Sequence, residues 1–339
     1  MPRAIFDPKP RDEAIALDEF ELIGQYFKPL ATAPEALGLA DDAAVLAPLP
    51  GLEWVVTTDA LIEGQHFLPG DPPGSLARKL LRVNLSDLAA KGATPRAYLL
   101  VLQAAGAPSE AWLEAFCAGL AADQSTFGVS LLGGDTVLTS GPLSLVVTAF
   151  GDLAAGSMIR RQGAAPGEVV WVTGTIGDGF LGLKALTEPG AWGGAGEMAA
   201  LIARYRHPEP RTDFGRHLPG LATAALDVSD GLLADAGHLA RASGVGIAIG
   251  ASAVPVSPAA QRALDASPWT LIDLCTGGDD YEILFTAPPS ATAEIERLAK
   301  VTGTDVTAIG TVSEGSQARL VDASGKPIHV ASPGYQHFR

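Results

Sequence analysis

Cysteine and basic residues are scarce in this chain of 339 residues. The two cysteines, Cys117 and Cys275, lie far apart without CxxC or zinc-ligand spacing, which argues against a disulfide framework and a zinc site. Lys and Arg number 23 against 38 Asp and Glu, so the formal net charge is -15. This balance argues against partners that need a basic surface, namely nucleic acid or an anionic membrane. If the protein handles phosphates, something other than Lys and Arg must neutralise them.

Long apolar runs are also absent. Residues Met1 to Arg11 lack the apolar core of a signal peptide, and no run reaches the ~18 apolar residues of a membrane span. We therefore expect a soluble cytoplasmic protein. No G-x-x-x-x-G-K-[ST] phosphate loop occurs. Gly177–Gly182 matches G-x-G-x-x-G, but no second strand follows it, which favours a glycine turn entering a helix over a dinucleotide site.

The length favours two domains at ~150 residues each, and a hydrophobic content of 47% allows each to bury a core. We predict a flexible tail over residues 1–17, a first domain over 18–150 and a second over 151–339, because a Gly-rich stretch begins near residue 151. Strand and helix patterns interleave, which predicts layers of α/β or α+β class. The patterns predict helices at 18–27, 75–91, 110–127, 179–186 and 232–243, and strands at 53–58, 98–102, 129–132, 143–150, 169–173, 224–228, 281–286 and 307–312.

The placement of the aspartates is more informative than their number. They fall at predicted strand ends or in turns, beside Gly, Ser and Thr. Carboxylates at strand ends point into the crevice where α/β proteins bind ligands, and several together need a cation between them. Such hard oxygen ligands suit Mg²⁺ or Ca²⁺. The motifs are Asp41-Asp42, Thr57-Thr58-Asp59, Asn84-Leu85-Ser86-Asp87, Gly133-Gly134-Asp135-Thr136, Asp227-Val228-Ser229-Asp230-Gly231 and Gly277-Gly278-Asp279-Asp280-Tyr281-Glu282.

Ordinary turn chemistry explains any one of these motifs but explains the whole set poorly. We therefore expect Mg²⁺ to join the aspartates to the phosphates of a nucleotide. His66, just beyond Asp59, is by itself a surface or hydrogen-bonded histidine; beside such a site it becomes a candidate contact for an acceptor. Arg160-Arg161 is either a solvated pair or a phosphate clamp.

In this order the motifs resemble the thiamine-monophosphate kinase family of the aminoimidazole ribonucleotide synthetase-like superfamily. The resemblance runs from about Glu19 to the ending Gly334-Tyr335-Gln336-His337-Phe338. It implies ATP-dependent phosphorylation of thiamine monophosphate to thiamine diphosphate, with release of ADP. It also implies an N-terminal α/β domain that forms a homodimer and a C-terminal α+β domain over it.

The resemblance also implies a role for each matching residue. Two positions depart from the family: Ala40 stands where a glycine is usual, and Asp279 stands where a glutamate is usual. Asp59, Asp87 and Asp230 are expected to be catalytic. The implied ligands of several Mg²⁺ ions are Asp42, Thr57, Thr58, Asp59, Asp87, Asp135, Asp227 and Asp230; the implied ATP contacts are Gly134, Asp135, Arg161 and Ser229; the implied substrate contacts are His66, Asp279 and Tyr335.

Three other functions can be compared with the kinase that the resemblance implies. Selenophosphate synthetase generally carries a reactive Cys or selenocysteine near its N-terminus, and none precedes Cys117 here. The hydrogenase maturation protein of the superfamily ends in Cys, whereas this chain ends in Arg339. A non-catalytic Mg²⁺- or Ca²⁺-binding regulator would show no acceptor-dependent turnover. Because a phosphate monoester is already a nucleophile at neutral pH, we expect direct in-line transfer with neither a strong general base nor a phosphoenzyme.

Overall fold

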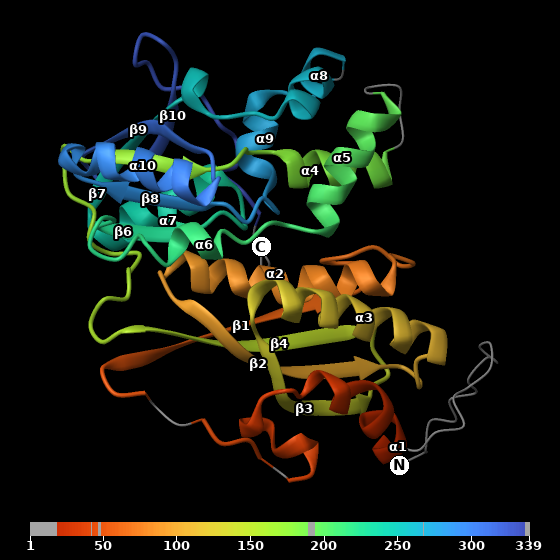
Figure 1. Ribbon diagram of the computed structural model, residues 1–339. Coiled ribbons are helices and arrows are strands. Elements are labelled where there is room, and N and C mark those ends of the chain that lie inside the picture. Colours follow the sequence, from red (N-terminus) through yellow and green to blue (C-terminus); the bar gives the residue numbers. More distant parts are fainter. Residues whose placement is uncertain (1–18, 42, 47–48, 189–193, 267, 336–339) are drawn as a thin grey trace, which may run out of the picture.

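The computed structural model describes residues 19–41, 43–46, 49–188, 194–266 and 268–335. The predicted tail over residues 1–17 and the predicted metal ligand Asp42 lie outside these ranges. The described chain forms two sheets, each covered by helices (Figure 1). None of the helices in these ranges combines the length and apolarity that a membrane span requires.

The first sheet has four strands in the order β1-β4-β2-β3. Only β2 and β3 pair in parallel; the other pairs are antiparallel. Helices α2 and α3 cover one face, and the N-terminal segment lies below the other face (Figure 1). The elements of this half are α1 (Glu19–Leu22), a π-helical turn (Ile23–Phe27), two 3-10 turns (Lys28–Leu30 and Pro34–Leu39), β1 (Leu52–Ile62), α2 (Pro73–Ala90), β2 (Thr94–Ala104), α3 (Glu110–Phe127), β3 (Ser130–Leu138) and β4 (Ser144–Ala154).

The second sheet has six strands in the order β10-β7-β9-β5-β8-β6, with only β10 and β7 parallel. Its core packs α7 on one face and α6 with α10 on the other. The helices α4, α5 and α8 form a smaller cluster beside it. The bounds are β5 (Val169–Thr173), α4 (Asp178–Thr187), α5 (Ala195–Arg206), α6 (Thr212–Gly215), β6 (Ala224–Asp227), α7 (Leu232–Ser243), β7 (Val245–Gly250), α8 (Pro258–Ala266), α9 (Leu271–Gly277), β8 (Ile283–Ala287), α10 (Thr292–Thr302), β9 (Val306–Glu314) and β10 (Ala318–Val321).

Local chemistry accounts for the helices that the sequence predicts best. Ser109 Oγ accepts a hydrogen bond from Trp112 N at 3.2 Å and caps α3, which ends at Gly128 with φ +66°. Gly177, with φ +94°, enters α4, so the G-x-G-x-x-G motif is the helix-entering turn that the sequence favours. The predicted boundary at residue 150 falls inside β4, and the segment that links the two sheets is 155–168.

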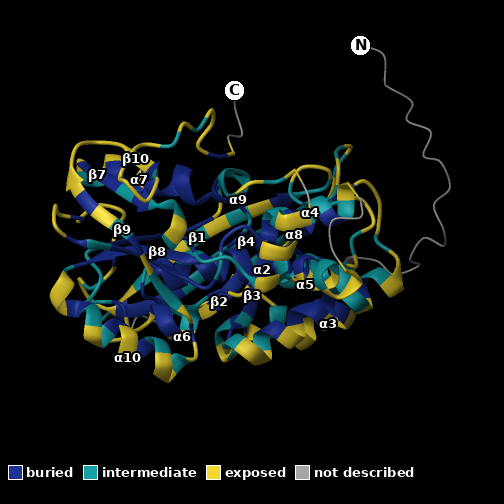
Figure 2. Ribbon diagram, turned by 90° about the horizontal axis from the view of Figure 1, so that it is seen from above, coloured by how far each residue is buried: buried dark blue, intermediate teal, exposed yellow. Residues whose placement is uncertain are grey.

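Helix α2 lies between the two halves. Its last residues, Ala89 and Ala90, are buried in one hydrophobic cluster with Phe214 and Phe285 of the second half. Arg82 Nη1 donates to the backbone oxygen of Pro208 at 3.0 Å. Figure 2 places α2 in the middle of the molecule, whereas α3 and α10 carry exposed residues on their outer sides. Polar side chains on α2 therefore face the boundary between the domains.

Candidate active site

An acidic cluster is built where β1 meets α2. Thr57 and Asp59 are two residues apart on β1, so both point toward α2. Thr57 Oγ1 donates to Asp87 Oδ2 at 2.5 Å, and the Asp59 amide donates to Asn84 Oδ1 at 3.0 Å. Asn84 and Asp87 are three residues apart and share one side of the helix. Asp59 therefore lies within a strand and Asp87 in the last turn of a helix, rather than at a strand end.

The second domain adds Asp227, the last residue of β6, to this cluster. Its carboxyl is buried, and its pKa is raised well above the usual range by burial first, then by Asp87, with Asp59 adding further repulsion. A cation between these carboxylates would relieve that repulsion. Because Mg²⁺ prefers hard oxygen ligands, Asp59, Asp87, Asp227 and the Thr57 hydroxyl fit a divalent metal ion.

Lys91 brings a positive charge to the same boundary. Its Nζ donates to the backbone oxygen of Ala225, two residues before Asp227, at 2.7 Å. Burial lowers the pKa of Lys91 to about 8, against the opposing effect of Asp227. The amine remains largely protonated at neutral pH. The acidic cluster therefore has a lysine beside it, in addition to the carboxylates that could hold a metal ion.

The loop before α7 holds Ser229 and Asp230. Asp235 Oδ2 accepts hydrogen bonds from both backbone amides, each at 3.0 Å, and fixes the loop at the start of the helix. Asp230, Asp235 and His238 bring ligand atoms within 4.8 Å of one another. Burial, followed by the charge of Asp230, raises the pKa of Asp235 to about 7, and the nearby Arg161 opposes this shift. Arg161 therefore lies close to the loop that holds Ser229, the other residue of this group predicted to contact the nucleotide.

The two predicted substrate contacts His66 and Asp279 meet at one buried amine. Lys79 Nζ lies 3.3 Å from Asp279 Oδ2 and 3.4 Å from the backbone oxygen of His66. Tyr281 OH donates to Asp279 Oδ1 at 3.1 Å. The pKa of Tyr281 is raised well above its usual range by burial, then by Asp279 and Asp59. Tyr281 therefore connects the predicted acceptor region to the acidic cluster.

Tyr335 also contacts the Ser229–Asp230 loop. Its amide donates to the backbone oxygen of Asp230 at 3.0 Å, and the amide of Asp279 donates to that of Ser229 at 2.9 Å. A cavity of about 620 Å³ beside α7 is lined by Asp230, Arg241 and Tyr335 among others. One loop thus positions the backbones of both Asp279 and Tyr335.

Gly134 and Asp135 lie at the opposite edge of the first sheet from Asp59. The strand registers place Asp59, Val147, Leu100 and Gly134 in one row across the sheet. Three strand spacings separate the ends of this row, about 14 Å. Asp135 is the next residue along β3, so its side chain points to the face opposite that of Asp59. One chain therefore does not form the single crevice that the sequence predicts.

The face that Asp135 occupies carries a cavity of about 800 Å³. Apolar residues such as Phe27, Leu39 and Phe150 line it, and Gly134 and Asp135 supply polar groups. An apolar pocket with a few polar groups is the usual form of a small-molecule site. The predicted metal ligands thus divide into two groups. One group lies toward the domain boundary and comprises Thr57, Asp59, Asp87, Asp227 and Asp230. The other group, Thr58 and Asp135, lies on the open face, which is the face of the first sheet opposite α2.

Sequence reasoning missed Lys79, Lys91, Asp235 and Tyr281. Asp235 had a local signal, since an aspartate in the first turn of a predicted helix is a capping residue. Lys79, Arg82 and Ser86 are buried polar residues three and four apart on α2, which is a polar stripe at helical spacing. The stripe indicates a functional surface only once α2 is known to lie between two domains.

Comparison with known proteins identifies the family. The family models described as AIR synthase related protein, N-terminal domain and C-terminal domain, match residues 40–153 and 165–323. Thiamine-monophosphate kinase of Caulobacter vibrioides is 45% identical over 324 residues, 94% of this chain and 90% of that protein. The chain belongs to the thiamine-monophosphate kinase family. The family's protein from Salmonella typhimurium is 38% identical over 96% of this chain and 99% of its own length. The resemblance found in the sequence is confirmed.

Solved structures of the family share the fold. The thiamine-monophosphate kinase of Stenotrophomonas maltophilia K279a has a TM-score of 0.79 at 36% identity, over 92% of this chain and 98% of that one. AaThiL, complexed with AMPPCP and TMP, has a TM-score of 0.75 at 30% identity, over 94% and 97%. The hydrogenase maturation protein HypE of E. coli has a TM-score of 0.76 at 22% identity, which shows a common fold alone. The expected two-domain fold class is confirmed.

Proposed function

We propose that this protein phosphorylates thiamine monophosphate to thiamine diphosphate, with ATP as donor and ADP released. The observation that carries the proposal is the acidic cluster of Asp59, Asp87 and Asp227, which adjoins the region where Lys79 meets Asp279. The names of the relatives and the complex of AaThiL with AMPPCP and TMP support both substrates.

Asp59, Asp87 and Asp227, with the Thr57 hydroxyl, would hold Mg²⁺ between the domains, and Asp230 would contribute from the next loop. Bound there, the metal supplies relief of phosphate repulsion and stabilises charge on the transferring phosphoryl group. Lys91 adds a fixed positive charge, and the Ser229 loop with Arg161 holds the nucleotide. The protein's part is to position the two phosphates in line.

The acceptor needs no strong general base, because its phosphate is already largely dianionic at neutral pH. His66, Asp279 and Tyr335 are assigned to hold the thiamine moiety rather than to move a proton. Transfer is therefore direct. Isolation of a phosphorylated protein that turns over when thiamine monophosphate is added would contradict this mechanism.

We also propose a homodimer that completes the site. Asp59 and Gly134 lie on opposite edge strands, and the face that carries Thr58 and Asp135 exposes apolar Val56 and Val137, 54% and 37% exposed. A two-fold dimer of this face would cover these side chains and could bring the β3 edge of one copy toward the β1 edge of the other. Gly134 and Asp135 of one copy would then belong to the same site as Asp59 of the second copy.

Mixing two inactive variants tests the shared site. Asp59→Asn and Asp135→Asn each damage both sites of their own homodimer. A mixed dimer places both changes in one site and leaves the other intact, so reassociation should restore about a quarter of wild-type activity. If mixed dimers form but activity is not restored, Asp59 and Asp135 of the same chain contribute to the same site, and the shared site is excluded.

ADP release measured with and without thiamine monophosphate tests the reaction itself. Acceptor-dependent release supports the kinase, and its absence favours the metal-binding regulator. Asp59→Asn should lower turnover on the order of 10³-fold, because it removes a ligand for the metal. Asp213→Asn, at an exposed side chain on α6, is the matched control and should leave turnover unchanged.

A further inference from the structure

We propose that Lys79 is a positioning residue that sets the affinity for the acceptor by orienting the carboxylate of Asp279. This inference rests on the function proposed above. It concerns a residue that the sequence motifs do not include, on the inner side of α2.

The amine of Lys79 joins four elements of the structure. Its side chain is only 3% exposed. Besides the contacts to Asp279 and to the backbone oxygen of His66, its Nζ lies 3.6 Å from the ring centroid of Tyr205 on α5. Tyr205 OH in turn donates to the same His66 oxygen at 3.3 Å. A buried ammonium with an anion, a carbonyl and an aromatic face around it has a fixed position.

Asp279 is held on each oxygen of its carboxylate. Lys79 binds Oδ2 and Tyr281 OH donates to Oδ1, while the backbone adopts φ +64°, an uncommon value for a residue other than glycine. The side chain remains 28% exposed, so the fixed carboxylate still has an accessible edge. A carboxylate in a set orientation complements the positively charged thiazolium ring of the acceptor.

The charges of the pair depend on one another. Burial lowers the pKa of Lys79, and the charge of Asp279 opposes this. Removal of Lys79 would leave Asp279 without the cation that orients it. The effect should therefore fall on acceptor binding, while ATP binding, assigned to the Ser229 loop and Arg161, should be spared.

A purely structural link between the same elements provides the control. Arg206 on α5 donates from Nε and Nη2 to Asp71 Oδ1 at 2.9 and 2.7 Å, in the loop that follows His66. Arg206→Met breaks this link without touching Asp279. Lys79→Met breaks the other link and also frees the carboxylate.

Steady-state kinetics of the full-length protein test the proposal. Lys79→Met should raise KM for thiamine monophosphate about tenfold or more, with kcat and KM for ATP changed less than about twofold. Arg206→Met should leave the acceptor KM unchanged. In a double-mutant cycle, Lys79→Met combined with Asp279→Asn should be no worse than the larger single effect, because both act through one carboxylate.

Three results would overturn the role of Lys79: an equal rise in acceptor KM in Arg206→Met, full multiplication of the two single effects, or an unchanged KM in Lys79→Met. Thermal melting checks that each variant is folded. If Lys79→Met does not fold, Lys79→Gln is used in its place. A wild-type protein without acceptor-dependent turnover would instead contradict the proposed function.

Discussion

Thr57 Oγ1 lies 2.5 Å from Asp87 Oδ2 and joins the middle of β1 to the last turn of α2. The bond fixes the position of Asp59, two residues further along the strand and held to Asn84. Asp59 and Asp87 therefore lie on a strand and a helix that pack in the hydrophobic core, rather than on loops. Ligands on such elements need little rearrangement when a metal ion binds.

Asp227→Asn should separate metal binding from folding. The buried carboxyl of Asp227 is repelled by Asp87, so the neutral amide should leave the metal-free protein as stable or more stable. Mg²⁺ should then raise the melting temperature less than in the wild type, since binding to the folded state is weakened. Melting curves with Mg²⁺ and with a chelator measure both effects.

Asp152→Asn is the control for Asp227→Asn. Asp152 is also buried, but it pairs with Arg96 at 2.8 Å within the first sheet. Its removal should lower the melting temperature with and without metal and leave the Mg²⁺ shift intact. A full Mg²⁺ shift in Asp227→Asn would exclude Asp227 as a ligand.

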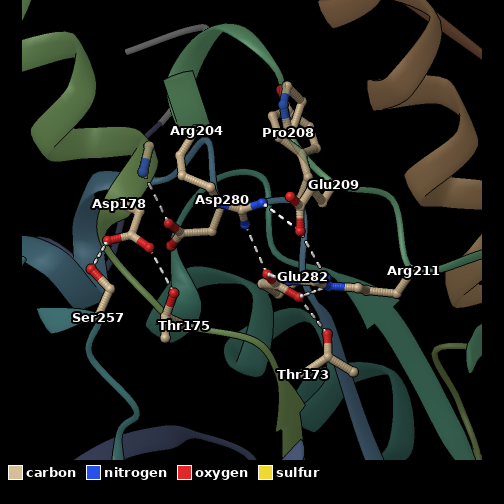
Figure 3. A network of polar contacts seen from close by, with 12 residues as sticks. Thr173, Thr175, Asp178, Arg204, Pro208, Glu209, Arg211, Ser257, Asp280 and Glu282 are labelled. Atoms are coloured by element: carbon tan, nitrogen blue, oxygen red, sulfur yellow. Dashed lines mark hydrogen bonds and ion pairs between the residues drawn. The ribbon is translucent and has the colours of Figure 1, made fainter. Parts of the chain in front are cut away.

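Glu282→Gln should be strongly destabilising. Glu282 is fully buried and accepts from Arg211 at 2.5 and 2.7 Å and from Arg204 at 2.8 Å (Figure 3). The neutral amide removes the buried anion that pairs with two guanidinium groups, at a cost of about 3–5 kcal/mol. Glu209→Gln removes an exposed partner of the same arginines and should cost about 0–1 kcal/mol. Urea unfolding measures both; equal losses would argue against a buried ion network.

His207 should make stability depend on pH. Burial, then Arg78 and Arg82, lowers its pKa to about 4. The unfolded chain, with a pKa near 6.5, gains the proton first as pH falls, so stability is lost between about pH 6.5 and 4. From pH 7 to 4.5 the wild type should lose about 1–2 kcal/mol more than His207→Gln, after solvent screening of the half-buried ring is counted. Urea unfolding across this range checks it; parallel profiles would contradict it.

Elements with local signals could be predicted from the sequence. The bounds of α3, α7 and β5 are those that the patterns indicate. The sequence predicts a glycine turn at Gly133–Thr136, but this motif continues β3. A Cβ at Gly134, φ +157°, would lie 1.7 Å from the backbone oxygen of Leu100 on the next strand. Glycine is therefore required at position 134 by a tertiary contact between two strands, which the local sequence does not reveal. The strain that a positive φ would cause at Ala40 does not arise, because its φ is −104°.

The candidate site was predictable as a set of residue types but not as a geometry. The motifs identified Asp59, Asp87 and Asp227, which the structure brings together from two domains. They also included Asp135, which the strand order places at the far edge, and no local pattern encodes strand order. Lys79 was missed because its partners come from three other segments of the chain.

Asp280→Asn should leave the protein nearly unchanged, although Asp280 follows the predicted substrate contact. Its Oδ1 accepts from the backbone amides of Gly177 at 2.8 Å and Gly179 at 3.4 Å, at the start of α4 (Figure 3). Its Oδ2 is buried without a hydrogen-bond partner among the described residues. Burial raises the pKa of Asp280 well above its usual range, which favours the neutral acid.

An asparagine keeps the neutral Oδ1 acceptor, and the free energy of unfolding should change by less than about 1 kcal/mol. Asp280→Ala leaves both amides unpaired and should cost about 2–4 kcal/mol. Urea unfolding compares the two variants, with turnover measured beside it. Asp280→Asn as unstable as Asp280→Ala would mean that the carboxyl is ionised and that its charge, rather than its shape, holds the turn against α4.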